Sequence, residues 1–131
     1  IQSYGNNVIQ FNLVHGNAVG ILTSSNDTVV HNQIYRNTAQ GILVDSDTNV
    51  QITSNTIYTA SGDGVRLRNS SSNVSLKNNI IWTNAGYDLY VTTDSQVGFA
   101  SDFNNLFTTW TRLYMFCHPY THTCQSTNLL L

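Results

Sequence analysis

The chain contains no glutamate, and charged residues make up only 9% of its 131 positions, against roughly a quarter in ordinary globular proteins. The formal net charge is −2 and no basic cluster is present. Since phosphate backbones are bound by clustered lysine and arginine, we expect no nucleic-acid partner. No apolar run approaches the ~20 residues of a membrane-spanning helix, so we expect no membrane span.

Proline, cysteine and methionine are absent from residues 1–107. All of them fall in the last part of the chain, where "CHPYTHTC" holds Cys117 and Cys124 beside His118 and His122. Three alternatives stay open for this group: a disulfide, a zinc site and free thiols. Residues 108–131 are predicted to be a non-repeat tail, either a cap over the last apolar layer or a segment read from a shifted frame.

Asparagine, threonine and serine supply most of the polarity, with seventeen, sixteen and thirteen residues respectively. Asparagine and serine compete with helical hydrogen bonds, and threonine loses rotamer freedom in a helix. Valine, isoleucine, threonine and aromatic residues favour strands, whereas asparagine and glycine favour turns. The composition therefore predicts an all-β domain.

A repeat of twenty-odd residues runs through positions 1–107. Its marker is an asparagine that recurs with steps of 20, 23, 24 and 25 residues, at Asn12, Asn32, Asn55, Asn79 and Asn104. Other columns keep the same register. An aliphatic residue stands two positions after the asparagine and an aromatic or histidine three after, as in Val14-His15, Ile34-Tyr35, Ile57-Tyr58, Ile81-Trp82 and Leu106-Phe107. A glycine follows at Gly20, Gly41 and Gly64, with Asp88 in the last full copy.

Such a period with two-residue alternation indicates a solenoid whose repeats bury their apolar faces only against their neighbours. The leucine spacing of leucine-rich repeats is missing. We therefore predict a right-handed parallel β-helix of about four to five coils over residues 1–107, with an asparagine ladder, an aliphatic interior and an aromatic column. His15 is expected to pack in the core or at a corner.

The copies resemble the parallel β-helix repeats of pectin lyase-like enzymes, mannuronan epimerases and large bacterial cell-surface proteins. The segment "GYDLYVTTDSQVGFASDFNNLF", from Gly86 to Phe107, is most similar to the surface proteins. The resemblance covers about residues 6–107. It implies the fold, an extracellular or cell-surface location and a substrate groove along one sheet, but no single activity, because one scaffold hosts several functions.

The strand after the glycine column is the candidate binding face. Alternation directs Arg66 and Tyr90 outward on adjacent coils, with Arg68 beside them and Asp88 at the edge. An aromatic ring and guanidinium groups could hold a sugar by stacking and by bidentate hydrogen bonds. A polysaccharide or cell-surface glycan is therefore the expected ligand, and ordinary solenoid surface is the alternative.

Catalytic patterns are weak by comparison. Calcium-dependent lyase chemistry needs several carboxylates and a base, but Asp45 and Asp47 in "VDSDTN" are more simply explained by turn chemistry. We expect no resident cofactor, calcium at Asp45 and Asp47 being the less favoured alternative.

The leading hypothesis is thus a non-catalytic structural, adhesive or glycan-binding segment of an exported bacterial protein. The competing one is a fragment of a polysaccharide lyase or uronate epimerase. Because residues 1–12 carry the repeat pattern and no signal-peptide sequence, we also expect the chain to be a slice of a longer solenoid, in contact with neighbouring coils of its parent.

Overall fold

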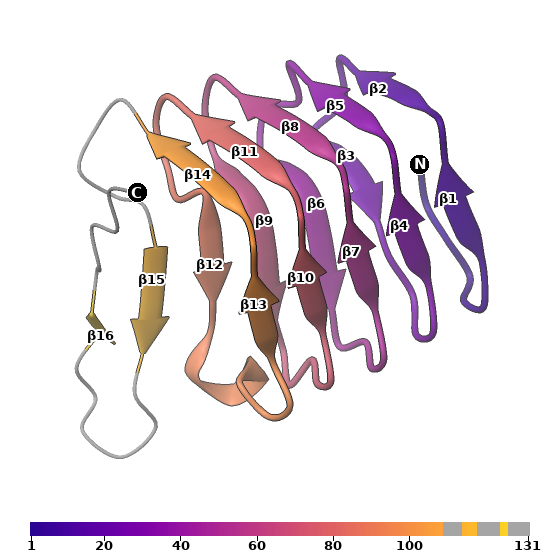
Figure 1. The fold of residues 1–131 in the computed structure, drawn as a ribbon, viewed down its shortest axis with the longest axis vertical. Coiled ribbons are helices and arrows are strands. Elements are labelled where there is room, and N and C mark those ends of the chain that lie inside the picture. Colours follow the sequence, from indigo (N-terminus) through magenta and orange to yellow (C-terminus); the bar gives the residue numbers. More distant parts are fainter. Residues whose placement is uncertain (109–113, 118–123, 126–131) are drawn as a thin grey trace.

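The computed structural model describes residues 1–108, 114–117 and 124–125, with side chains placed for residues 1–107. Its strands form three sheets that wrap around one interior (Figure 1). The first sheet contains β1 (Val8–Gln10), β4 (Thr28–Val30), β7 (Gln51–Thr53), β10 (Ser75–Lys77) and β13 (Ala100–Asp102). The second sheet contains β2 (Leu13–His15), β5 (Gln33–Tyr35), β8 (Thr56–Thr59), β11 (Ile80–Thr83) and β14 (Asn105–Thr108).

The third sheet contains β3 (Val19–Leu22), β6 (Gln40–Asp45), β9 (Asp63–Arg68), β12 (Leu89–Val91), β15 (Tyr114–Cys117) and β16 (Cys124–Gln125). One 3₁₀ turn, η1 (Thr93–Ser95), follows β12. In the described part of the chain, no helix has the length and apolarity that a membrane crossing requires.

Successive coils pair in parallel, each strand with its counterpart one repeat away. In the first sheet Val8 faces Thr28, Thr28 faces Gln51, Gln51 faces Ser75 and Ser75 faces Ala100. These partners are separated by the same steps as the repeated asparagines. The structure is therefore a parallel β-helix, and the predicted all-β solenoid fold is confirmed.

The interior is mainly aliphatic. Single inward residues from each short strand stack on their counterparts, as Ile34, Ile57 and Ile81 do in the second sheet. The buried set consists of Ile9, Val14, Ile21, Val29, Ile34, Ile42, Val44, Val50, Ile52, Ile57, Val65, Leu67, Val74, Leu76, Ile81, Leu89 and Val91. Because no coil can enclose these side chains alone, stability depends on the contact between coils.

The turn between the first and second sheets places the repeated asparagines in one column. Asn32, Asn55 and Asn79 are each 1% exposed. The Nδ2 group of each donates to Oδ1 of the asparagine in the next coil, at 3.0 Å from Asn32 to Asn55 and 3.1 Å from Asn55 to Asn79. Nδ2 of Asn32 also donates to the Ile9 carbonyl at 2.8 Å. Both ends of the amide are thus satisfied within the protein, as a buried polar group requires.

The residue before each of these asparagines adopts a left-handed backbone conformation. Phe11, His31, Ser54, Asn78 and Phe103 have φ between 53° and 56°. Side chains other than glycine adopt this region at a cost, but here it bends the chain sharply from one sheet to the next. The amide of Ser54 then still donates to the Lys77 carbonyl in the next coil, at 3.1 Å.

Part of the predicted tail lies outside the described residues. The backbone of β15 pairs in parallel with β12, and β16 pairs with β15 in the antiparallel sense, with Cys124 opposite Cys117. The nature of the tail and the bonding of these two cysteines stay predictions.

An aspartate at Ile81 should abolish folding, whereas one at the adjacent Ile80 should be tolerated. Ile81 is 0% exposed and Ile80 is 51% exposed. An unpaired charge in the aliphatic stack costs more than about 4 kcal/mol, but a surface change usually costs less than about 1 kcal/mol. Circular dichroism and thermal unfolding of Ile81→Asp and Ile80→Asp measure both effects. Equal stability of the two variants would contradict the inward assignment.

Candidate functional site

The third sheet brings two of the predicted glycan-face residues together. Arg66 on β9 and Tyr90 on β12 are direct partners in the parallel register, and their neighbours Val65 and Leu67 are buried. The guanidinium carbon of Arg66 lies 4.6 Å from the centroid of the Tyr90 ring. This is the geometry of a cation–π contact, in which the negative face of the ring attracts the guanidinium.

Two further residues complete a group that we call the Arg66 cluster: Asp63, Arg66, Tyr87 and Tyr90. Nη1 of Arg66 donates to Oδ2 of Asp63 at 3.3 Å, and the Tyr87 amide donates to Oδ1 of Asp63 at 3.0 Å. The Tyr87 and Tyr90 rings lie 5.2 Å apart. Sequence reasoning missed Tyr87, although its position three residues before Tyr90 places it at the same sheet edge.

The ion pair between Asp63 and Arg66 does not satisfy both partners equally. Burial raises the pKa of Asp63, against the hydrogen bond from the Tyr87 amide and the nearby charge of Arg66. Nε of Arg66 is buried and has no hydrogen-bond partner in the described part of the chain. The guanidinium is thus held by one long ion pair and a ring, and its hydrogen-bonding capacity is not saturated.

Arg68 is engaged elsewhere. Its Nε and Nη2 donate to Oδ2 of Asp45 at 3.0 and 2.7 Å, and Nδ2 of Asn69 donates to the other oxygen of Asp45 at 2.6 Å. The hydrogen bond from Arg68 is the main cause of the lowered pKa of Asp45. Arg68 therefore clamps two coils together, and Asp45 accepts bonds from protein groups.

Asp47, the other acidic residue of "VDSDTN", faces a different environment. It accepts a hydrogen bond from the Thr23 hydroxyl at 2.9 Å, and burial raises its pKa. Its backbone amide donates to Ser71 Oγ in the next coil, at 3.3 Å. Within the described residues no group of three or more His, Cys, Asp or Glu side chains could hold a metal ion.

Asp88 is not at the outer edge of the glycan face, where we expected it. The side chain is 0% exposed and points into the corner between the second and third sheets, because position 88 belongs to the column of Gly20, Gly41 and Gly64. A side chain at Gly64 would meet Ile81 and the backbone of position 88 in the interior. The Thr83 hydroxyl donates to Oδ1 of Asp88 at 2.8 Å, but Oδ2 has no hydrogen-bond partner among the residues that the structure describes.

This environment raises the pKa of Asp88 to about 7, with burial as the main cause. The native state therefore holds the proton up to about neutral pH, while the unfolded chain releases it near the ordinary value of 3.8. Since the raised pKa favours the neutral form, the contribution of Asp88 to the free energy of unfolding is fully present below pH 4. It is lost progressively as the pH rises towards 7.

The aromatic column also differs from expectation. His15, Tyr35, Tyr58, Trp82 and Phe107 point outward from the second sheet, and His15, predicted in the core or at a corner, is exposed. The alternation explains this orientation: Val14, Ile34, Ile57 and Ile81 occupy the inward positions, so the next residue must face solvent. This orientation could have been predicted from the alternation of inward and outward residues within each strand, which the comparison of repeats alone does not show.

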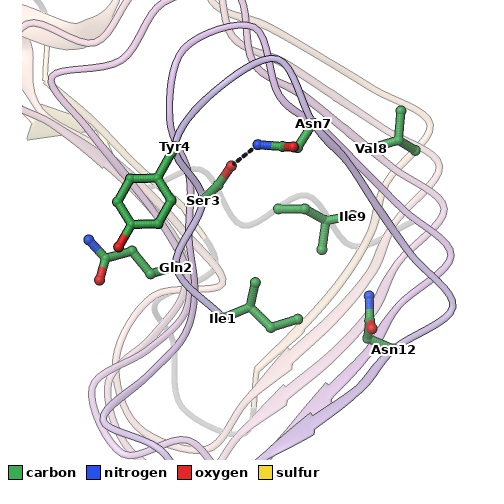
Figure 2. A pocket seen from close by; sticks show the side chains of 8 residues that line it. All are labelled: Ile1, Gln2, Ser3, Tyr4, Asn7, Val8, Ile9 and Asn12. Atoms are coloured by element: carbon green, nitrogen blue, oxygen red, sulfur yellow. Dashed lines mark hydrogen bonds between the residues drawn. The ribbon is translucent and has the colours of Figure 1, made fainter.

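A hollow of about 360 Å³ lies at the N-terminal end of the aliphatic interior. Figure 2 shows the side chains of Ile1 and Ile9 directed into it, with Ser3 and Asn7 joined by a hydrogen bond of 3.0 Å at its rim. Gln2, Tyr4, Val8 and Asn12 complete the lining. The lining contains no carboxylate or imidazole, so it offers no acid–base pair.

The geometry defines a parallel β-helix whose third sheet carries the Arg66 cluster. The family model described as "Right handed beta helix region" matches residues 1–106. The chain belongs to this family, and the predicted right-handed sense is confirmed with it. No curated protein and no solved structure matches the chain.

Substituting Asp88 by Asn should stabilise the protein increasingly as the pH rises. The amide keeps the acceptor for Thr83 and never ionises. The free energy of unfolding of Asp88→Asn should therefore equal that of the parent near pH 4 and exceed it by up to about 4 kcal/mol at pH 8. Urea unfolding of both proteins across this range measures the difference, and the other aspartates cancel in the comparison. A difference that does not vary with pH would contradict the buried, protonated carboxyl.

Proposed function

We propose that the chain is a non-catalytic, glycan-binding segment of an exported bacterial β-helix protein, displayed outside the cell or on its surface. The observation that carries the proposal is the stack of Arg66 on Tyr90 across adjacent strands of a rigid sheet. A ring beside a guanidinium offers both an apolar face for a sugar ring and hydrogen-bond donors for its polar groups.

The Arg66 cluster favours an acidic glycan. The Arg66 side chain is 32% exposed and its acidic partner Asp63 lies at 3.3 Å. A sugar carboxylate that approached the remaining Nη donors would add a charge-assisted bond. Asp63 also accepts a hydrogen bond from the Tyr87 amide at 3.0 Å, so its carboxylate is shared between Arg66 and the backbone.

The hydrogen bonds of the carboxylates support a structural role for the chain. Asp27 accepts from the backbone amides of Asn7 and Ser24, at 3.0 and 2.8 Å. All seven aspartates accept at least one hydrogen bond from a protein group: Asp27, Asp45, Asp47, Asp63, Asp88, Asp94 and Asp102. Each carboxylate is thus used to hold turns or neighbouring coils in place.

Calorimetric titration with hexagalacturonate, a linear acidic sugar, tests this proposal. We expect saturable binding that Arg66→Ala or Tyr90→Ala weakens at least tenfold, or about 1.4 kcal/mol. Arg36→Ala is the matched control, because this substitution removes the same charge at a different sheet. The guanidinium carbon of Arg36 lies 6.0 Å from the ring centroid of Tyr35, which belongs to the second sheet. Binding by Arg36→Ala should equal that of the parent.

Incubation of the same sugar with the protein checks the non-catalytic part of the proposal. A lyase would release unsaturated uronates that absorb ultraviolet light, so the absorbance should stay constant. A rise in absorbance that Arg66→Ala abolishes would overturn the non-catalytic proposal and favour the fragment of a polysaccharide lyase.

A further inference from the structure

The outer face of the second sheet carries a second, chemically different surface. Figure 1 shows its strands side by side, from β2 to β14. The aromatic row, His15, Tyr35, Tyr58, Trp82 and Phe107, places one ring on every coil. A parallel row two residues earlier on each strand, the outer row, consists of Leu13, Gln33, Thr56, Ile80 and Asn105.

The rings of the aromatic row contact one another in two groups, His15 with Tyr35 and Tyr58 with Trp82 and Phe107. His15 and Tyr35 are stacked with centroids 5.0 Å apart, while Trp82 lies 5.3 Å from both Tyr58 and Phe107 and stands nearly perpendicular to each, at 70° and 87°. Trp82 is 44% exposed and Phe107 is 55% exposed. The row, with His15, Trp82 and Phe107 exposed and Tyr35 and Tyr58 half-buried, extends over five coils, on the order of 20 Å at ordinary strand spacing.

Hydrogen-bonding groups accompany the rings along the same face. Gln33, Thr56 and Asn105 of the outer row are exposed, and the Tyr58 hydroxyl accepts a hydrogen bond from Nδ2 of Asn84 at 2.9 Å. None of the ten side chains in the two rows carries a formal charge when His15 is neutral. The face thus combines flat apolar groups with neutral amides and hydroxyls.

From these observations we infer that the aromatic row is a binding platform for an uncharged, extended polysaccharide that lies along the solenoid axis. Sugar rings present an apolar C–H face, which packs on aromatic rings, and peripheral hydroxyls, which bond to amides and hydroxyls. A ligand with a repeating unit matches a surface that repeats at every coil. The two uncharged rows complement an uncharged ligand, with Arg36 beside Tyr35 at the edge of the face, whereas the Arg66 cluster complements an acidic one. This inference rests on the proposed glycan-binding function and gives it a second site.

Fluorescence of Trp82 provides a direct probe. The chain has two tryptophans, Trp82 and Trp110, so Trp110→Phe leaves Trp82 as the only indole. Cellohexaose, xylohexaose and mannohexaose are titrated separately into this protein. The inference predicts a saturable shift in Trp82 emission with at least one of them. No saturable change with any of the three would overturn it.

Variants locate the site by calorimetry with the sugar that binds. Trp82→Ala and Tyr58→Ala should weaken binding at least tenfold, whereas Trp82→Phe, which keeps a ring at this position, should stay within about threefold of the parent. Lys77→Ala, which removes an exposed charge from β10 in the first sheet, serves as the control and should bind the neutral sugar unchanged. Circular dichroism of each variant establishes that the fold is kept. Undiminished binding by a folded Trp82→Ala would overturn the platform.

Two further outcomes separate this inference from the function it rests on. If hexagalacturonate binds through Arg66 and no neutral sugar binds, the platform is wrong and the proposed function stands. If neither class of sugar binds, both are wrong. Sedimentation equilibrium tests the remaining occupant, a second copy of the chain: a dimer that Trp82→Ala dissociates would make the face a protein interface and overturn the platform.

Discussion

The hydrogen bonds between successive coils are the constraint on which every other feature depends. Each short strand pairs in parallel with its counterpart one repeat away, and the asparagine turn repeats this pairing with buried side chains. A residue type that suits one coil must therefore suit the position above and below it. The aliphatic stack, the outward aromatic row and the glycine corner are all consequences of that register.

The three connections between the sheets differ in how far their lengths vary along the chain. Two residues separate the first and second sheets in every coil, from 11–12 to 103–104, and they combine a left-handed residue with an asparagine. This asparagine is buried in the three middle coils. The connection from the third sheet to the first instead lengthens along the chain, from residues 23–27 to residues 92–99. The growing repeat step is thus absorbed away from the asparagine turn. Loops of this kind are where a solenoid can vary without losing its register.

Residue pattern predicted the solenoid and its interior, because columns of aliphatic residues at the repeat step can only pack on one another. The positions and partners of individual polar side chains were harder to predict from the sequence. The clamp between Arg68 and Asp45 joins positions 23 residues apart, which requires the register of two particular strands. We predicted Asp88 at the edge of the glycan face, but its side chain is buried because position 88 belongs to the glycine column, which borders the interior. The aromatic row was assigned by its regular spacing, but alternation within each strand decides which way a ring points.

Cysteine cross-linking between neighbouring coils tests the register most directly. In a chain with Cys117 and Cys124 replaced by serine, Gln33→Cys with Thr56→Cys places two exposed thiols on direct partners. Strand spacing brings their Cα atoms to about 4.8 Å, within the range for a disulfide. Mild oxidation should cross-link this pair rapidly and should leave the offset pair, Gln33→Cys with Tyr58→Cys, reduced. Faster cross-linking of the offset pair, or none in the direct pair, would contradict the stacking of coils on which the structure depends.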